Sequence, residues 1–365
     1  MDVLIRADAS LAMGQGHVMR CLTLAGALRG QGLVARFVCR EHPGKLCDFI
    51  EAQGFPVSRL PLPAAASLPQ AEPGAGYAAW LGGSWADDAA QTRAVIAQVG
   101  TRPSWLVVDH YGLDARWEIS LKASAGRIMV IDDLADRPHD ADLLLDQNLY
   151  PGMDRRYAGL VKADCIQLLG PGHALLRPEF VEARAQVRVR DGSIRRVLVF
   201  FGGSDATNET GKALDAMAML DMTGVEVDIV VGAANPRREV LATRCAGLPN
   251  VRFHCQVPHM SELMAAADLS LGAGGSTTWE RCATGLPALV IAVADNQVAI
   301  ARAVDQAKAL RYLGAEHEVS AHMLARSITA LRENPQALQD MSAAALALVD
   351  ARGAGRVVAA MKGVP

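Results

Sequence analysis

Short, almost wholly apolar runs alternate with longer stretches rich in Ala and Leu along the whole chain, the pattern of a parallel α/β protein. Because these runs contain few polar positions, we expect strands that helices cover on both faces. The expected strands are Val3–Arg6, Val34–Cys39, Trp105–Asp109, Ile128–Ile131 and Leu143–Leu145, followed by Val197–Phe201, Val225–Val231, Val251–His254, Leu269–Leu271 and Ala288–Ala292.

The two halves of the chain open alike, with a buried strand, a glycine-containing loop and then an amphipathic helix, near Val18 and near Asn208. A length of 365 residues suits two domains. We expect a first domain over residues 1–185 and a second over residues 190–365. Each is predicted to be a Rossmann-like, doubly wound sheet, so that the two domains face a cleft that binds the ligand.

Three segments outside the strands complete this organisation. The charge-rich stretch 177–196 is predicted to link the domains, and the Ala-, Pro- and Gly-rich stretch 64–76 is predicted to be a surface loop. Helices from about Gln297 onward finish the chain, and the last one is a candidate to pack back on the first domain.

Composition excludes several classes of partner. With 36 Lys and Arg against 39 Asp and Glu, and only 5% aromatic residues, the chain lacks both the positive field and the stacking platforms of nucleic-acid-binding proteins. Early charges and the absence of a long apolar run predict neither a signal peptide nor a membrane span, so we expect a cytoplasmic protein. The seven cysteines form no Cys-x-x-Cys pair, so no zinc knuckle is expected. The oligomeric state stays open.

The loop after the first strand carries a histidine at the start of a helix, His17, behind Gly14 and Gly16. Met19 stands where a dinucleotide fingerprint needs its third glycine, so this loop is not of that type. The positive end of a helix disfavours an imidazolium, and a neutral imidazole is a competent general base. Arg20, one turn on, is placed to hold an anion or a carboxylate. Alternatively, His17 caps the helix and Arg20 is solvated.

A glycine-rich loop in the second half, residues 272–276, joins a predicted strand to a helix that begins near Ser276. Backbone amides of such a loop bind phosphate without a metal, which makes Gly275, Ser276 and Thr277 candidate ligands. Glu280, one turn into the helix, can reach the hydroxyls of a ribose. The alternative is a tight strand-to-helix connection with Glu280 as a surface charge.

Other loops that follow predicted strands offer weaker candidates for binding a substrate. They are Gly203 and Ser204 as a companion anion site, Val257 and Met260 as backbone contacts to a flat base, Tyr111 as a hydroxyl and stacking face, and Asn296 and Gln297 as amides for a substituted sugar. The alternatives are ordinary turns and, at Asn296, a helix cap. The pairs Asp109-His110 and Asp132-Asp133 could bind sugar hydroxyls, order a loop or orient a base.

Together, a diphosphate loop with a ribose acid in one domain and a histidine in the other predict an enzyme that acts on a nucleotide sugar. A nucleoside diphosphate leaves easily once its charge is stabilised, so the remaining need is one base to activate an attacking hydroxyl. His17 is the strongest candidate. Attack opposite the leaving group would invert the anomeric centre.

The opening motif also resembles that of a known family. Arg6-Ala7-Asp8 followed by residues 14–21 is similar to the start of the UDP-2,4-diacetamido-2,4,6-trideoxy-β-L-altropyranose hydrolases of pseudaminic acid biosynthesis. The similarity continues through Trp80-Leu81-Gly82, Asp109-His110-Tyr111, Ile131-Asp132-Asp133-Leu134, Asp146-Gln147-Asn148, Phe201-Gly202-Gly203-Ser204-Asp205, residues 272–287 and Asn296-Gln297. The stretch before Trp80 is longer than we expect for the family.

This resemblance implies that His17 activates water, that UDP and the free sugar are released, and that no metal or other cofactor is needed. Ser276, Thr277 and Glu280 match the UDP motif of the family, and Tyr111 and Asn296 match positions for the sugar. The second half is also similar to the peptidoglycan N-acetylglucosaminyl transferase, of the glycosyltransferase-B fold. A glycosyltransferase, a UDP-sugar 2-epimerase and a non-catalytic nucleotide-sugar-binding protein therefore remain alternatives.

Overall fold

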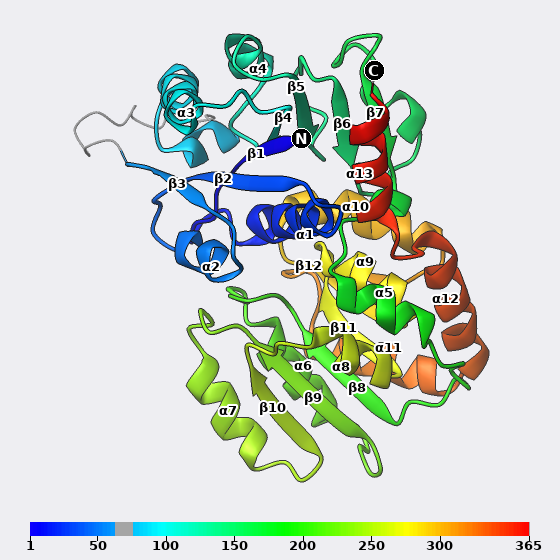
Figure 1. Cartoon of the computed structure of the whole chain (residues 1–365). Helices are drawn as coiled ribbons and strands as arrows, with labels where there is room; N and C mark the ends of the chain where they lie inside the picture. The colour runs from blue at the N-terminus through cyan, green and yellow to red at the C-terminus, as the bar shows by residue number, and fades with distance from the viewer. Residues whose placement is uncertain (63–75, 365) are drawn as a thin grey trace. The chain divides into compact units, whose positions relative to one another are not determined.

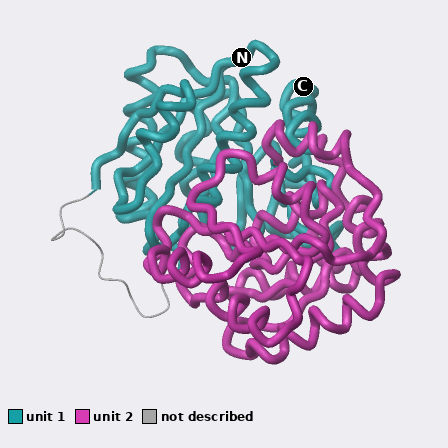
Figure 2. The backbone as a smooth tube through the Cα atoms, turned by 90° about the horizontal axis from the view of Figure 1, so that it is seen from below, with its two compact units in different colours: residues 1–148, 152–175, 353–365 teal, residues 149–151, 176–352 magenta. Residues whose placement is uncertain are grey.

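The computed structural model describes residues 1–62 and 76–364, which form two compact units. Unit 1 comprises residues 1–148, 152–175 and 353–365, and unit 2 comprises residues 149–151 and 176–352 (Figure 2). The stretch 177–196, predicted as a linker, contains the helix α5 (Pro178–Ala185). The loop predicted over 64–76 lies outside the described residues except for Gly76.

Unit 1 contains a parallel sheet of seven strands in the order β3-β2-β1-β4-β5-β6-β7 (Figure 1). Its strands are β1 (Asp2–Ala7), β2 (Val34–Arg40), β3 (Val57–Leu60), β4 (Trp105–Asp109), β5 (Arg127–Ile131), β6 (Leu143–Asp146) and β7 (Ile166–Leu169). Its helices are α1 (Gly16–Gly30), α2 (Cys47–Ala52), α3 (Trp85–Val99), α4 (Ala115–Leu121) and α13 (Gly353–Gly363), with 3-10 turns at Gly76–Leu81, Met153–Arg155 and Pro171–His173.

Alternate residues of these strands enter two separate hydrophobic clusters, one on each face of the sheet. Val3 and Ile5 of β1 pack in the cluster that includes residues of α1 and α13, whereas Leu4 packs in the cluster that includes residues of α3 and α4. Because both faces are covered, a strand of this sheet needs apolar residues at successive positions. This explains the continuous apolar runs of the sequence.

Unit 2 repeats this plan with a parallel sheet of six strands in the order β10-β9-β8-β11-β12-β13. Its strands are β8 (Arg196–Phe200), β9 (Glu226–Val231), β10 (Val251–Cys255), β11 (Leu269–Ala273), β12 (Ala288–Ala292) and β13 (Arg311–Ala315). Its helices are α5, α6 (Glu209–Met217), α7 (Arg238–Ala246), α8 (Met260–Ala266), α9 (Thr277–Ala283), α10 (Asp295–Gln306), α11 (Ala321–Arg332) and α12 (Pro335–Leu348). The prediction of two Rossmann-like, doubly wound α/β sheets is confirmed.

All ten predicted strands are present, with ends shifted by at most two residues. The prediction missed β3, β7 and β13, which lie at the edges of the two sheets. An edge strand is covered less completely, so it tolerates polar residues, as the sequences VSRL, IQLL and RYLGA show. The expectation of uninterrupted helices after Gln297 is corrected, because β13 separates α10 from α11.

The last helix, α13, is part of unit 1, where it packs against α1. Its first residue, Gly353, lies so close to residues 173–174 that a Cβ atom there would stand 2.3 Å from the carbonyl oxygen of Ala174. Only glycine therefore allows this approach. Among the helices of the described residues, none is both long enough and apolar enough to cross a membrane.

A buried network of charges ties β1, β2 and α3 together in unit 1. Arg6 forms ion pairs with Asp8 (2.6 Å) and Asp88 (2.7 Å), and Arg40 pairs with the same carboxylate of Asp88 (2.7 Å). The Nε1 group of Trp117 also donates to Asp88 (3.0 Å). Burial alone would raise the pKa of Asp8, but the charge of Arg6 together with hydrogen bonds from His42 and Arg6 outweighs it and holds that pKa well below its usual value. The Arg6-Ala7-Asp8 motif thus has a structural role.

Asp88→Asn should destabilise the protein strongly, because it leaves Arg6 and Arg40 buried with half of their negative charge removed. We expect the free energy of unfolding to fall by about 3 kcal/mol in urea titrations. Asp87→Asn is the matched control, since Asp87 is exposed and should change the value by less than about 0.5 kcal/mol. Equal effects of the two substitutions would contradict the role of the network.

Candidate functional site

The order of strands in unit 1 reverses between β1 and β4, and the candidate site lies where these two neighbouring strands end. β1 pairs directly with β4, and Ala7 is in register with Asp109. The loop after β1 leads to α1, which begins at Gly16, and Gly14 has the positive φ of +75° that favours glycine. In open α/β sheets, ligands bind outside the carboxyl ends of the strands at this reversal.

His17, in the first turn of α1, contacts the last residue of β4. Its Nδ1 atom lies 2.5 Å from Oδ1 of Asp109, and both side chains are buried. A carboxylate accepts hydrogen bonds, so this contact requires the proton of the ring to be on Nδ1 and leaves Nε2 as the basic atom. Among the described residues, nothing is hydrogen-bonded to Nε2. The interpretation of His17 as a mere helix cap is wrong, since the cap position is Gln15 and has no side-chain bond.

Arg20 lies one turn further along α1 and completes a fork with Asp109. Its Nε and Nη2 atoms donate to the two oxygens of that carboxylate at 2.6 and 2.7 Å. Burial alone would raise the pKa of Asp109, but the charge of Arg20, and then that of His17, hold it well below its usual value. Asp109 therefore stays ionised and orients the ring. Arg20 is occupied by this carboxylate rather than solvated.

The site extends to the ends of β5 and β6 through Asp133. This carboxylate accepts from Nη1 of Arg20 (3.1 Å), the hydroxyl of Tyr111 (2.5 Å) and Nδ2 of Asn148 (3.0 Å). The ring of Tyr111 stands edge-on to His17 with centroids 4.6 Å apart. Residues from four strand ends thus form one polar cluster around His17.

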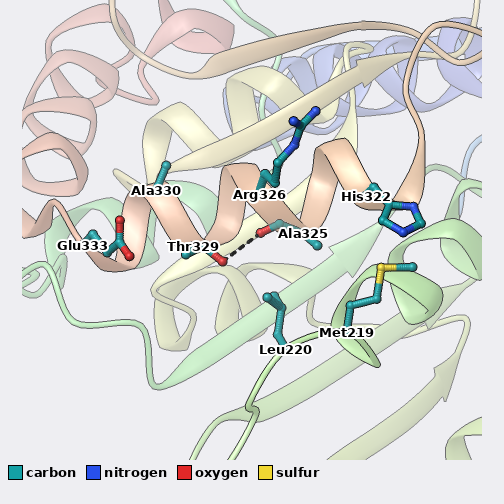
Figure 3. A pocket seen from close by; sticks show the side chains of 8 residues that line it. All are labelled: Met219, Leu220, His322, Ala325, Arg326, Thr329, Ala330 and Glu333. Carbon is teal, nitrogen blue, oxygen red and sulfur yellow. Dashed lines mark hydrogen bonds between the residues drawn. The ribbon is translucent and has the colours of Figure 1, made fainter.

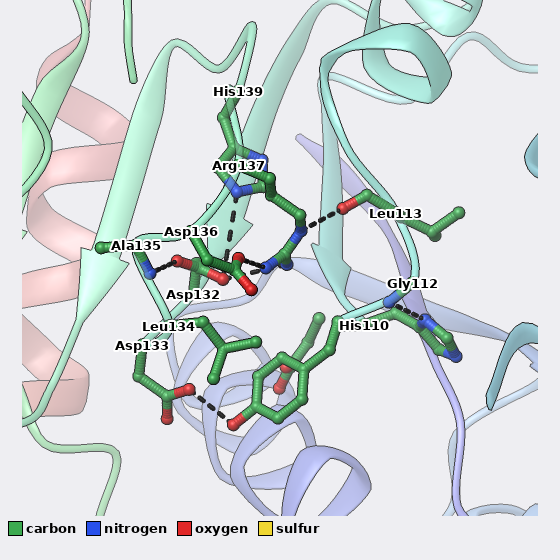
Figure 4. A network of polar contacts seen from close by, with 12 residues as sticks. His110, Gly112, Leu113, Asp132, Asp133, Leu134, Ala135, Asp136, Arg137 and His139 are labelled. Carbon is green, nitrogen blue, oxygen red and sulfur yellow. Dashed lines mark hydrogen bonds and ion pairs between the residues drawn. The ribbon is translucent and has the colours of Figure 1, made fainter. Parts of the chain in front are cut away.

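Asp132, the neighbour of Asp133, turns away from this cluster and has a structural role. It pairs with Arg137 (2.9 Å) and accepts from the backbone amide of Ala135 (2.9 Å) (Figure 4). Arg137 also donates to the carbonyl of Leu113, which ties the loops after β4 and β5 together. Asp132 therefore supports the surrounding loops, whereas Asp133 belongs to the polar cluster around His17.

Two further aromatic residues adjoin the site, and the sequence analysis did not propose them as ligands. Tyr77 and Trp80 come from the 3-10 turn Gly76–Leu81, and their rings lie 5.0 and 5.9 Å from the ring of Tyr111. Both are half-buried. An aromatic group beside a catalytic base can offer its face to the apolar side of a ligand. The only sequence signal was Trp80 within the family resemblance.

In unit 2 the strand order reverses between β8 and β11, and both predicted anion loops follow these adjacent strands. After β11, Gly275 and Thr277 are half-buried and Ser276 is exposed. The side chain of Gln297 fixes the loop, since its Oε1 atom accepts from the amides of Gly274 and Val293, both at 3.1 Å. Gln297 is thus a support of the loop.

Glu280 projects from α9 and its side chain is 16% exposed. Its Oε1 atom lies 3.3 Å from Nη2 of Arg177, which also pairs with Glu179 at 3.1 Å. Burial raises the pKa of Glu280, partly offset by the charge of Arg177. Glu280 is therefore mostly buried and ion-paired, unlike the surface charge of the alternative interpretation.

The loop after β8 offers less than the sequence indicated. Gly203 and Ser204 are exposed, but the next residue, Asp205, turns its carboxylate onto the start of α6. It accepts from the amides of Glu209 (2.8 Å) and Thr210 (3.0 Å). These donors are therefore already satisfied, and an anion could use only the exposed loop itself.

The remaining candidates are spread around the ends of β10 and β12. Met260 is buried as the first residue of α8, and Val257 is half-buried in the loop before it. Asn296 is exposed in α10. It does not cap that helix, because the cap position is Ala294 and has no side-chain bond.

A pocket of about 550 Å³ lies on unit 2 and involves none of these residues (Figure 3). It is formed by α11 and the segment after α6, and it is lined by Met219, Leu220, His322, Ala325, Arg326, Thr329, Ala330 and Glu333. The described residues contain no group of three or more His, Cys, Asp or Glu side chains that could hold a metal ion.

The contact with Asp109 predicts the tautomer of His17. At a pH high enough to leave the ring neutral, ¹⁵N NMR should show the proton on Nδ1, with the signal assigned by its loss in His17→Asn. In Asp109→Asn the side-chain amide can donate as well as accept, so a mixture of both tautomers is expected. A wild-type ring protonated on Nε2 would contradict the proposed orientation.

Most of the second unit is similar to a known protein domain. Residues 197–356 match the model of the glycosyltransferase family 28 C-terminal domain. The chain is 29% identical over 195 residues to the spore coat polysaccharide biosynthesis protein SpsG of Bacillus subtilis, covering 53% of this chain and 57% of that protein. It is 26% identical over 265 residues to the UDP-2,4-diacetamido-2,4,6-trideoxy-beta-L-altropyranose hydrolase of Campylobacter jejuni, covering 72% and 81%. The first curated relatives are matched over little more than half of their own length.

A solved structure similar to the whole chain is MurG of Acinetobacter baumannii, with a TM-score of 0.68, 15% identity and 99% of each chain covered. A likeness at this identity shows the fold alone. The chain thus has the glycosyltransferase-B fold, and its residues 197–356 are similar to the C-terminal domain of glycosyltransferase family 28.

Proposed function

We propose that the protein is a UDP-sugar hydrolase, with His17 as the catalytic base. The substrate would be a UDP-linked 2,4-diacetamido-2,4,6-trideoxy sugar, and the products UDP and the free sugar. The observation that carries this proposal is the His17–Asp109 contact at 2.5 Å, which holds an imidazole with a free Nε2 atom at the carboxyl end of β1. A protein that only binds nucleotides has no need of an oriented base.

The proposed reaction is one displacement at the anomeric carbon. Nε2 of His17 accepts a proton from water while the water oxygen bonds to C1, and the bond from C1 to the diphosphate oxygen breaks, with its electrons leaving on UDP. Asp109 stabilises the imidazolium that forms, as in other carboxylate–histidine pairs. The ring then returns its proton to solvent. Attack opposite the leaving group inverts C1.

We assign UDP to unit 2 and the sugar to the cluster around His17. The backbone of residues 274–277 would bind the diphosphate, and Glu280 the ribose. Tyr111, Tyr77 and Trp80 would contact the sugar, and Asn296 its acetamido group. Gly203, Ser204, Val257 and Met260 remain candidate contacts to the nucleotide. The match of residues 197–356 to a glycosyltransferase domain supports the nucleotide assignment.

The second candidate is a glycosyltransferase, in which a hydroxyl of an acceptor replaces water. The match of residues 197–356 favours this candidate, because the matching model is named after a glycosyltransferase domain. The Gly14-Gln15-Gly16-His17 motif and the similarity to the Campylobacter hydrolase favour hydrolysis. An incubation with the UDP-sugar and no acceptor separates the two, because only a hydrolase releases stoichiometric UDP.

His17→Asn should slow this release by about a thousandfold or more, since the other basic groups of the cluster, Asp109 and Asp133, are already occupied by hydrogen bonds. The affinity for UDP should stay within about twofold, because His17 does not contact the nucleotide in this proposal. Coupled detection of UDP and a titration with UDP measure the two quantities. His317→Asn, at a 74% exposed position, is the control and should leave both unchanged. Strong residual turnover in His17→Asn would reject the base.

Glu280→Ala should mainly weaken nucleotide binding, by about tenfold for UDP, through loss of hydrogen bonds to the ribose. Wild-type protein should prefer UDP over 2′,3′-dideoxyuridine diphosphate, and the variant should lose this preference. Glu179→Ala is a matched control, because Glu179 shares the partner Arg177 but should not touch the ribose. A preference retained in Glu280→Ala would remove the ribose role.

A further inference from the structure

Arg281 is a buried cation that forms no ion pair with a carboxylate of the described residues. Its side chain is 2% exposed, and it donates from Nη2 to the carbonyl of Ala273 (2.7 Å) and the hydroxyl of Thr278 (3.0 Å), and from Nη1 to the hydroxyl of Thr277 (3.4 Å). All three acceptors are neutral. No carboxylate of the described residues lies within 4 Å of the guanidinium, and its Nε atom is buried without a partner. An unpaired buried charge is destabilising.

A second buried arginine of the same unit, Arg190, shows how such a charge can be balanced. Its nitrogens donate to four backbone carbonyls, those of Met264 (3.1 Å), Ala267 (3.0 Å), Thr284 (2.8 Å) and Gly285 (2.8 Å). These carbonyls stand at the C-terminal ends of α8 and α9, which carry partial negative charge. Arg190 is therefore compensated within the protein.

Arg281 lacks this compensation because its guanidinium contacts residues at the other end of α9. Thr277 and Thr278 are the first residues of that helix, where the backbone carries partial positive charge. The charge of Glu280, the nearest acid in sequence, acts on Arg281 without an ion-pair contact, and Glu280 already pairs with Arg177. Burial lowers the pKa of Arg281 to about 10, which still leaves it charged at neutral pH.

The absence of a side chain at Gly272 leaves space for the guanidinium of Arg281 beside the glycine-rich loop. A Cβ atom on Gly272 would stand 2.6 Å from Nη1 of Arg281 and 2.9 Å from the carbonyl oxygen of Phe200. Residue 272 must therefore be glycine for the guanidinium to lie beside the end of β11, where that strand is paired with β8. The guanidinium of Arg281 therefore lies beside the start of the glycine-rich loop, residues 272–276.

We propose that Arg281 is a positioning residue for the nucleotide. The negative charge of the diphosphate balances the positive charge of Arg281, which no ion pair among the described residues balances. It acts on the phosphates through the loop and through space, without touching them. The same charge would stabilise UDP as it leaves. This inference rests on the proposed UDP site in unit 2, and it requires a ligand with a diphosphate rather than a neutral nucleoside.

The test compares the affinities for UDP and for uridine, because a charge effect scales with the phosphates whereas a general disturbance of the loop weakens both ligands. Arg281→Met and Arg281→Gln remove the charge, and the Gln variant keeps a hydrogen-bond donor to support the fold. Arg281→Lys keeps the charge. The quantity measured, by calorimetry or by NMR titration for weak binding, is the ratio of the uridine Kd to the UDP Kd.

We expect this ratio to fall by about tenfold or more in Arg281→Met and Arg281→Gln, and to stay within about threefold of wild type in Arg281→Lys. Arg190→Met, the matched control, should destabilise the protein but leave the ratio unchanged. The role of Arg281 is overturned if both neutral variants keep the wild-type ratio, or if Arg190→Met lowers it equally. A wild-type ratio near one would instead overturn the nucleotide site itself, and with it this role.

Discussion

The pairing of β1 with β4 in unit 1, and of β8 with β11 in unit 2, is the constraint on which each candidate site depends. These parallel pairs join segments that are far apart in the sequence and bring their carboxyl ends side by side. In unit 1 the pairing sets Asp109 against the loop that carries His17. In unit 2 it sets the loop after Phe200 beside the one after Ala273. A parallel pair requires a long crossover, so no local rule places these residues together.

The two units differ in the partners of the arginines near their candidate sites. In unit 1 the buried Arg6 and Arg40 and the mostly buried Arg20 all pair with carboxylates, so the network at Asp88 and the cluster around His17 hold their shape without a ligand. In unit 2 Arg281 donates only to neutral groups among the residues that the structure describes. A site that orients a base gains from complete internal pairing, since the ring must not move. A site that binds an anion gains from a charge left uncompensated, because the ligand then completes the pairing.

Prediction from the sequence succeeded for elements whose pattern is local to the chain. The ten predicted strands, nine inner ones and the edge strand β10, follow from apolar runs. The roles of His17 and Glu280, chosen from glycine loops next to helices, stay predictions. The sequence analysis missed β3, β7 and β13, whose half-covered positions carry polar residues. It also proposed an anion site at Gly203 and Ser204, although the carboxylate of Asp205 already binds the backbone amides of Glu209 and Thr210 that begin the following helix. A side chain that turns back on its own helix leaves no signature in an apolar pattern.

The sequence by itself determined the two parallel α/β sheets, because burial on both faces forces apolar residues at successive positions of a strand. It also determined that glycine-containing loops directly precede the helices that carry His17 and Glu280. Only the tertiary structure decided that Asp109 contacts His17, that Asp132 and Asp133 enter different polar networks, and that Arg281 forms no ion pair within the described part of the chain. Each of these depends on distances between side chains from different strands and helices, which are fixed by strand order and packing rather than by spacing along the chain.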